Sequence, residues 1–264
     1  MGFGFSGATS VFVMDPDLAD ALNEISKVNV LLVVCDLDGT IAPLCEDPSA
    51  IVLDGNSIRS LESIGMLGST HVAILSGRTR SGLVAVLGDD CPFLLIGEHG
   101  AEIDSGQPVL TDDQKFVLDR TCVILEEAVE MHKGAWLERK KFGAAIHFRL
   151  CADGSGAQLS KLASAVVPLR WDFEVIEGKS IVEVRVGGAN KGAALERLRH
   201  ELNADAVLFV GDDQTDEDAF ETMGRGDLAI KVGNGATLAW TRVPDETAVG
   251  VVLEELARLR AIGA

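Results

Sequence analysis

The stretch that decides the fold is Val30-Leu31-Leu32-Val33-Val34-Cys35-Asp36-Leu37-Asp38-Gly39-Thr40, in which an apolar run ends at two aspartates. The apolar run predicts a buried strand, and Gly39 allows a sharp turn after it. Side chains two residues apart on an extended segment point the same way, so Asp36 and Asp38 are expected to lie together. In an open parallel sheet, ligands bind at this carboxyl end of the strands. One carboxylate can attack an electrophile while the other transfers protons, although an acidic loop after a strand gives the same pattern.

Three further segments place polar side chains where apolar runs end or helices begin. Residues 72–75 form an apolar run before Ser76-Gly77-Arg78, and Lys191 lies where a helical stretch begins. The apolar run over residues 207–211 leads into an acidic cluster over residues 212–218. This order of an aspartate pair, a hydroxyl, a lysine and an acidic corner resembles the haloacid-dehalogenase-like phosphatases, whose four sequence motifs are all present. The resemblance implies an α/β fold with a doubly wound parallel-sheet (Rossmann-like) hydrolase core.

The composition favours an ordinary globular protein that binds neither nucleic acid nor anionic membrane surfaces. The chain has 264 residues, 47% of them hydrophobic, and a formal net charge of −18. Such an acidic chain repels polyanions, and no apolar run approaches the roughly 18 residues of a membrane helix. The five cysteines form no Cys-x-x-Cys pair and the first lysine is Lys27, which is typical of a reduced protein without a secretory signal. We therefore expect a cytoplasmic protein that acts on a small molecule, with a monomer favoured.

The order of predicted elements divides the chain into a core and an insertion. Residues 1–28 are expected to form an N-terminal tail and a lead-in helix, residues 29–110 and 187–264 the phosphatase core, and residues 111–186 a cap domain. In the core, helices are expected at residues 17–27, 55–67 and 249–259, and strands ending at residues 35, 75, 96, 211 and 232. The insertion reads helix–strand–strand–helix–strand–strand, which indicates a separate α+β module. Its elements are expected at residues 112–132, 135–138, 144–150, 157–167, 173–176 and 181–186.

The resemblance implies a role for each acidic residue of the core. Asp36 would attack phosphorus to form an aspartyl-phosphate, and Asp38 would protonate the leaving alcohol and then deprotonate the attacking water. Mg²⁺ favours hard oxygen ligands, which Asp36, the backbone carbonyl of Asp38 and the carboxylate of Asp212 would supply. Asp213 and Asp216 are expected to orient waters or the site lysine, although either could be a ligand.

Ser76 and Lys191 are expected to hold the phosphate. Ser76 would donate to a phosphate oxygen, and Lys191 would pair with the phosphate and with the nucleophile. Ser76 is also placed to cap the following helix, and Arg78 fits a surface salt bridge as well as a substrate ligand. The acids Glu217-Asp218 are expected to complement the dipole of the helix that they open.

The insertion carries the more specific resemblance. Glu138-Arg139-Lys140, His147-Phe148-Arg149 and the stretch over residues 178–185 resemble the cap motifs of the trehalose-6-phosphate phosphatases. Gly97-Glu98-His99-Gly100-Ala101-Glu102 and residues 211–220 match that family almost residue for residue. One departure is Glu98, because the family usually has a small or neutral side chain there.

In that family, the cap residues hold the hydroxyls of the distal sugar ring. By position these are Glu138, Lys140, Arg149, Lys179 and Glu183, with His147 either beside them or part of the cap interior. Charged side chains suit this role because they form strong hydrogen bonds. The resemblance thus implies Mg²⁺-dependent hydrolysis of trehalose 6-phosphate to trehalose and phosphate. Phosphates of sucrose, mannosylglycerate, glucosylglycerate or a pseudo-disaccharide stay open as alternatives. A non-catalytic phospho-aspartate signalling module is a further alternative, although such modules lack a cap and a residue like Asp38.

Overall fold

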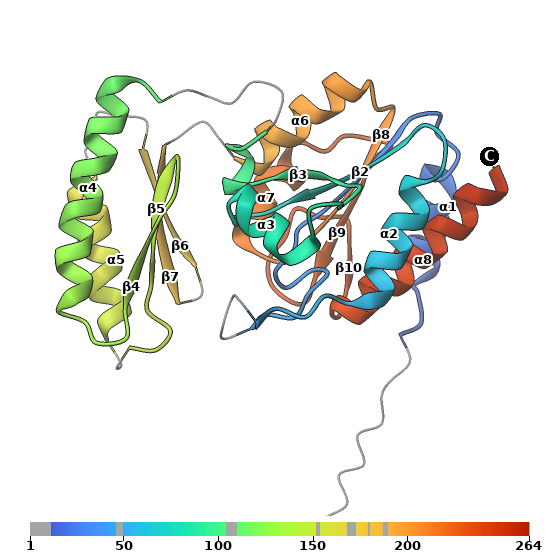
Figure 1. Ribbon diagram of the computed structural model, residues 1–264. Coiled ribbons are helices and arrows are strands. Elements are labelled where there is room, and N and C mark those ends of the chain that lie inside the picture. Colours follow the sequence, from blue (N-terminus) through green and yellow to red (C-terminus); the bar gives the residue numbers. More distant parts are fainter. Residues whose placement is uncertain are drawn as a thin grey trace, which may run out of the picture.

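The computed structural model of the chain has two lobes (Figure 1). It describes residues 12–45, 50–103, 110–151, 154–167, 173–178, 180–186 and 190–263. The larger lobe, here called the core, contains a six-stranded parallel sheet, and the smaller lobe, the cap, contains a four-stranded antiparallel sheet. The elements of the cap follow the third strand of the core along the chain and precede its fourth, so the cap is an insertion in the core.

The core is doubly wound, with helices on both faces of its sheet. The strand order is β10-β9-β8-β1-β2-β3. The strands are β1 (Leu31–Cys35), β2 (Thr70–Leu75), β3 (Leu94–Ile96), β8 (Ala206–Gly211), β9 (Leu228–Val232) and β10 (Thr241–Val243). The helices are α1 (Pro16–Ile25), α2 (Gly55–Gly65), α3 (Arg80–Leu87), α6 (Lys191–Leu202), α7 (Gln214–Thr222) and α8 (Glu246–Gly263), with a short 3-10 turn, η2 (Glu98–Gly100). Alternate strand residues face opposite ways, so Val33 packs in the cluster with α1, α2 and α8, whereas Val34 packs in the cluster with α6 and α7. This arrangement confirms the predicted fold class.

The register of the core sheet brings three strand ends together. β1 pairs in parallel with β2 on one side and with β8 on the other. Because the carboxyl ends of parallel strands meet at one edge of a sheet, the residues after these strands emerge side by side. Asp36, Ser76 and Asp212 are these residues.

The cap has one apolar and one polar face. Its sheet has the order β4-β5-β7-β6, and its elements are α4 (Asp112–Glu130), β4 (Trp136–Arg139), β5 (Gly143–His147), α5 (Ser155–Val166), β6 (Phe173–Gly178) and β7 (Ile181–Val186). Ile146, Val182 and Val184 pack against Leu125 of α4 and Leu159 of α5. In Figure 1 these two helices cover the outer side of the sheet, and the opposite face is turned toward the core.

A single arginine fastens the last helix to the beginning of the core. Arg260 of α8 is buried and donates hydrogen bonds to the side chain of Thr70 and to the backbone carbonyls of Ser26, Val28, Asn29 and Ser69. The same helix packs along α2. The first and last parts of the described chain are thereby joined.

Most predicted elements are present, with shifted ends. The order of the cap elements is confirmed, and α4 begins at the predicted residue because Thr111 and Gln114 form a capping box. The strand expected over residues 144–150 ends at His147 instead, because the chain turns there and Leu150 is exposed. β10, a strand of three residues, was not among the predicted elements.

The lead-in helix is present as α1, whereas most of the predicted N-terminal tail lies outside the described residues. Among the helices of the described ranges, none has the length and apolar character that crossing a membrane requires.

Candidate active site

The candidate active site lies at the carboxyl edge of the core sheet. Asp36 follows β1, Asp212 follows β8 and Asp216 lies in the first turn of α7. One carboxylate oxygen from each of the three lies within 4.8 Å of the others. Gly39 permits this approach, because a Cβ at this position would lie 2.3 Å from an oxygen of Asp212. The φ of Gly39 is +87°, which other residues rarely adopt.

Lys191 is the cation that joins these acids. It is the first residue of α6, whose N-cap is Asn190, and it is 1% exposed. Its Nζ donates to Asp36 Oδ1 at 2.8 Å and to Asp216 Oδ1 at 2.7 Å. Burial lowers the pKa of Lys191, but Asp216 and Asp36 outweigh burial and keep the pKa well above its usual value. Lys191 therefore stays charged at neutral pH and positions the carboxylate of Asp36.

Asp212 has a carboxylate oxygen without a partner. Its Oδ1 is buried and accepts no hydrogen bond, and burial, Asp216 and Asp213 raise the pKa of Asp212 to about 7. A divalent cation would satisfy this oxygen, and the hard oxygens of Asp36 and Asp212 suit Mg²⁺. Both oxygens of Asp216 are instead taken by hydrogen bonds from Lys191 Nζ and from the backbone N–H of Asp213. Asp216 is therefore better placed to orient the lysine than to bind a metal.

Asp213 shapes the loop before α7. It is the N-cap of α7, and its Oδ1 accepts from the backbone N–H groups of Thr215 and Asp216. Burial raises the pKa of Asp213, but Lys191 and the hydrogen bond from Thr215 bring it below its usual value. The ionised side chain of Asp213, as N-cap residue, fixes the start of α7 and with it the position of Asp216.

The side chain of Asp38 lies against Arg78. Arg78 donates from Nε and Nη2 to the two oxygens of Asp38, both at 2.7 Å. Hydrogen bonding to Asp38 raises the pKa of Arg78 against the effect of burial, and the charge of Glu138 in the cap adds to the rise. Arg78 therefore forms a salt bridge, which is partly buried and lies within the site rather than on the open surface, and its role as a substrate ligand stays a prediction.

Ser76 is buried at the end of β2, where its Oγ accepts from the backbone N–H of Arg78 at 3.2 Å. The alternative that Ser76 caps the following helix is wrong. α3 begins at Arg80, and its N-cap residue is Thr79, whose Oγ1 accepts a hydrogen bond from the backbone N–H of Gly82 at 3.1 Å. The phosphate-binding role of Ser76 stays a prediction.

Lys231 and Glu217 brace the acidic loop, a role that the sequence did not reveal. Lys231 of β9 is buried and donates to the backbone carbonyl of Asp213 at 3.1 Å and to Glu217 at 3.2 Å. Glu217 also accepts from the backbone N–H of Leu238 at 2.7 Å, which ties the loop after β9 to α7. Glu217 thus does more than complement a helix dipole. The sequence held one signal for this role, which is the position of Lys231 within the apolar run of β9. A lysine buried in such a strand needs an acidic or carbonyl partner.

The cap and the core meet in a cluster of buried charged side chains. Lys140 Nζ donates to the carbonyl of Gly77 and to Glu183 Oε1, both at 2.9 Å. The imidazole of His99 donates from Nε2 to Glu183 Oε2 at 3.1 Å. Burial raises the pKa of Glu183, but Lys140 and His99 lower it to about 2. Two residues expected to hold sugar hydroxyls are therefore bonded here to each other and to the core loop that follows β2.

Glu98 reaches the same junction from the core. It adopts φ +46° and His99 adopts φ +54°, a left-handed conformation that strains residues other than glycine. The Glu98 carboxylate accepts from the backbone N–H groups of Lys141 at 2.7 Å and Phe142 at 2.9 Å. The departure from the family pattern thus has a structural role, since it holds the turn between β4 and β5 against the core.

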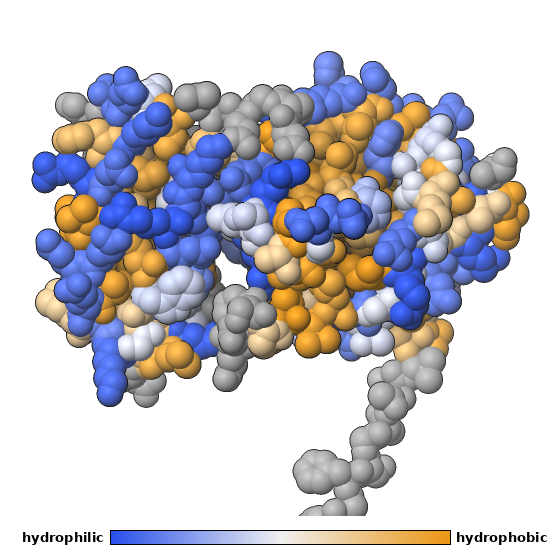
Figure 2. All heavy atoms as spheres, in the orientation of Figure 1, coloured by the Kyte–Doolittle hydropathy of each residue, from blue (hydrophilic) through white to orange (hydrophobic). Residues whose placement is uncertain are grey.

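The other cap residues of the predicted site lie farther from the junction. His147 Nε2 is 3.0 Å from Glu138 Oε2, and the side chain of His147 is 20% exposed, so it is not a fully buried interior histidine. Exposed Arg149 donates to the carbonyl of Cys45 in the core at 2.6 Å. Lys179 lies outside the described residues. Figure 2 shows an opening between the two lobes.

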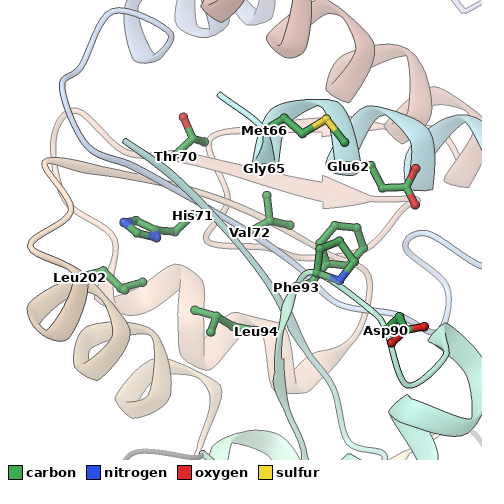
Figure 3. A pocket seen from close by; sticks show the side chains of 11 residues that line it. Glu62, Gly65, Met66, Thr70, His71, Val72, Asp90, Phe93, Leu94 and Leu202 are labelled. Atoms are coloured by element: carbon green, nitrogen blue, oxygen red, sulfur yellow. The ribbon is translucent and has the colours of Figure 1, made fainter. Parts of the chain in front are cut away.

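A hollow in the core takes no part in this site (Figure 3). It is lined by Thr70 and Val72 of β2, Leu94 of β3 and Met66 of the preceding loop, among others. Thr70 begins β2, a strand of six residues, so the two ends of the strand are about 17 Å apart. The carboxylates emerge at the opposite end of the sheet.

Several known proteins have sequences similar to that of this chain. The trehalose-phosphatase family model matches residues 34–242. A trehalose-6-phosphate phosphatase from Escherichia coli (strain K12) is 31% identical over 218 residues, which cover 80% of this chain and 81% of that protein. A bifunctional trehalose-6-phosphate synthase/phosphatase from Thermoproteus tenax is 32% identical over 247 residues, which cover 89% of this chain and 33% of that protein. The chain thus spans about a third of the bifunctional relative.

A solved structure supports the fold. The C-terminal domain of trehalose-6-phosphate phosphatase from C. albicans superposes with a TM-score of 0.79 at 23% identity and covers 95% of this chain and 99% of that one. The family model and the Escherichia coli relative each match most of this chain. The chain therefore belongs to the trehalose-phosphatase family, a family of phosphoric monoester hydrolases with the haloacid-dehalogenase-like fold.

Proposed function

We propose that the protein hydrolyses trehalose 6-phosphate to trehalose and phosphate, with Mg²⁺ as cofactor and Asp36 as the residue that is phosphorylated. The observation that carries the proposal is Lys191 between Asp36 and Asp216, beside the unpaired oxygen of Asp212. A phosphate monoester is a dianion, so attack by a carboxylate requires fixed cations at the site. Family membership and a cap whose polar face turns toward the site support a sugar phosphate as substrate.

In the first step, a carboxylate oxygen of Asp36 forms a bond to phosphorus while the bond from phosphorus to the sugar oxygen breaks. Lys191 balances charge on the phosphoryl oxygens, and Ser76 donates a hydrogen bond to one of them. In its protonated form Asp38 gives its proton to the leaving sugar oxygen. In its ionised form the carboxylate of Asp38 is oriented by two hydrogen bonds from Arg78.

In the second step, a water oxygen forms a bond to phosphorus and the bond to Asp36 breaks. Asp38, now ionised, accepts the proton of this water and returns to its starting state. One residue thus serves as acid and then as base, which balances the protons over the cycle.

Asp36 and Asp212 would hold Mg²⁺ together with the backbone carbonyl of Asp38. Bound there, Mg²⁺ would neutralise phosphoryl charge and reduce the repulsion among the carboxylates. The donor set consists of hard oxygens, one of them buried and without a hydrogen bond, and this chemistry fits Mg²⁺ better than a softer metal.

A panel of phosphate esters tests the function. Purified protein is assayed for phosphate release with malachite green on trehalose 6-phosphate, sucrose 6-phosphate, the phosphates of mannosylglycerate and glucosylglycerate, glucose 6-phosphate and p-nitrophenyl phosphate. We expect the highest kcat/KM with trehalose 6-phosphate and no release by Asp36→Asn. A higher kcat/KM with another sugar phosphate would assign that ester instead, and release by Asp36→Asn at the normal rate would refute the covalent mechanism.

We further propose a cytoplasmic location, which the five free cysteines support. A monomeric state stays a prediction, which light scattering of the purified protein tests directly.

A further inference from the structure

The register of the cap sheet identifies the side chains that face the core. On β4 and the residue after it, alternate positions point the same way, and Lys140 reaches the carbonyl of Gly77 in the core. On β7, Glu183 reaches His99 in the core. Trp136 and Glu138 share the face of Lys140.

On this face, Trp136 and His147 form a stacked pair. The two residues are register partners on β4 and β5. Their ring centroids are 3.9 Å apart and their planes differ by 8°. The His147 ring is held in turn by Glu138, whose Oε2 lies 3.0 Å from Nε2. Trp136 is nonetheless 45% exposed, so a rigidly held indole keeps an open surface on the core-facing side of an edge strand.

We propose that the Trp136–His147 pair is a platform on which the outer ring of a disaccharide phosphate stacks. This inference rests on the proposed function and adds a specificity-determining residue to it. A pyranose ring has an apolar face of C–H bonds, and the negative face of an indole attracts such polarised hydrogens. Glu138, beside the platform, is partly buried and accepts hydrogen bonds from hydroxyls on the ring edge.

The position of Trp136 favours two linked rings over one. Lys140 touches the core loop that carries Ser76, and Trp136 precedes Lys140 by four residues, or about 13 Å of extended chain. Glu138 lies halfway along this distance and influences Arg78 electrostatically. A phosphate held at Ser76 would place one hexose near Lys140, and only a second linked hexose would reach Glu138 and Trp136.

Steady-state kinetics test the platform. In Trp136→Ala, we expect KM for trehalose 6-phosphate to rise about 10-fold with little change in kcat, and Trp136→Phe should restore most of the loss. The same variants should change kcat/KM for glucose 6-phosphate and p-nitrophenyl phosphate by less than about twofold, because those esters do not reach the platform. Phe116→Ala is the matched control, since Phe116 is an exposed cap aromatic, 63% exposed, on α4.

A binding measurement separates this proposal from the substrate assignment. In Asp36→Asn, which keeps the cap intact, titration with trehalose should change the tryptophan fluorescence, and the additional Trp136→Phe substitution should abolish that change. Equal losses in Trp136→Ala on all esters, unchanged KM for the disaccharide ester, or a fluorescence change that survives Trp136→Phe would each overturn the platform. A different outcome is that sucrose, but not trehalose, changes the tryptophan fluorescence and that sucrose 6-phosphate has the highest kcat/KM among the esters. That outcome would support the platform and show that the proposed substrate is wrong.

Discussion

Removing the Glu98 carboxylate should loosen the cap from the core. Glu98 is 4% exposed and accepts two backbone hydrogen bonds from the turn between β4 and β5. In Glu98→Ala, the buried N–H of Phe142 loses its partner at a cost of about 1–3 kcal/mol, and the more exposed N–H of Lys141 loses about 0.5–1.5 kcal/mol. Burial raises the pKa of Glu98 more than these N–H groups lower it, so the relief of desolvation offsets part of the loss. We expect a net loss of about 2 kcal/mol in the free energy of unfolding.

Glu98→Gly is the informative companion variant. It removes the same carboxylate but also relieves the strain of φ +46°, so it should be more stable than Glu98→Ala by about 1 kcal/mol. Urea unfolding followed by circular dichroism measures both differences. Because the turn also carries Lys140, both variants should raise KM for trehalose 6-phosphate while leaving p-nitrophenyl phosphate hydrolysis nearly unchanged. Wild-type stability and wild-type KM in Glu98→Ala would refute the reasoning.

Three further predictions concern the metal, the two aspartates and the charged cluster at the junction. Excess EDTA should abolish phosphate release, and added Mg²⁺ should restore it. Ca²⁺ should support phosphate release poorly, because its looser coordination misplaces the nucleophile. Full activity in excess EDTA would contradict the metal site. Asp36→Asn should fold normally by circular dichroism with no turnover, and Asp38→Asn should lower kcat by roughly 10²–10⁴-fold; a near-normal rate in either would contradict its role. Glu183 has its pKa lowered from 4.5 to about 2, against burial, by Lys140 and His99. It therefore stabilises the fold above pH 4.5 by about 3 kcal/mol, and this contribution is lost as the pH falls toward 2. In urea unfolding, the wild type should lose about 3 kcal/mol more stability than Glu183→Gln between pH 4.5 and pH 2. Parallel pH profiles of the two proteins would show that the ion pairs of Glu183 with Lys140 and His99 contribute nothing.

The core site was predictable because its residues follow strands whose ends must coincide. Asp36, Ser76 and Asp212 each end an apolar run, and a parallel sheet collects such ends at one edge. Lys191 could be placed because a helix begins there and buried carboxylates need a cation. The cap interior was predictable for a similar reason, since alternating apolar residues define one face of each strand.

The junction between cap and core was not predictable in this way. Glu98 bonds to backbone N–H groups 43 and 44 residues away, and no side-chain pattern reports such partners. The hydrogen bond from Lys140 to the core depends on how the cap sheet is oriented relative to the core sheet. Neither the helical nor the strand periodicity of the sequence encodes that orientation. Capping of the following helix was an alternative role for Ser76 that rested on proximity alone, whereas Thr79, three residues later, caps α3.

The bonds of Arg260 have a consequence for how the chain is made. Residues 16–103 supply α1, α2 and half of the core strands, but α2 also packs against α8, so part of its apolar face stays uncovered until α8 has been made. At the usual speed of translation, residue 260 is added about 4–15 s after residue 186. Throughout that interval the sheet of the cap has all its strands, while the core waits with an apolar helix face uncovered. We expect a nascent chain in this state to be accessible to chaperones that bind apolar segments, and ribosome stalling before residue 260 to prolong its exposure.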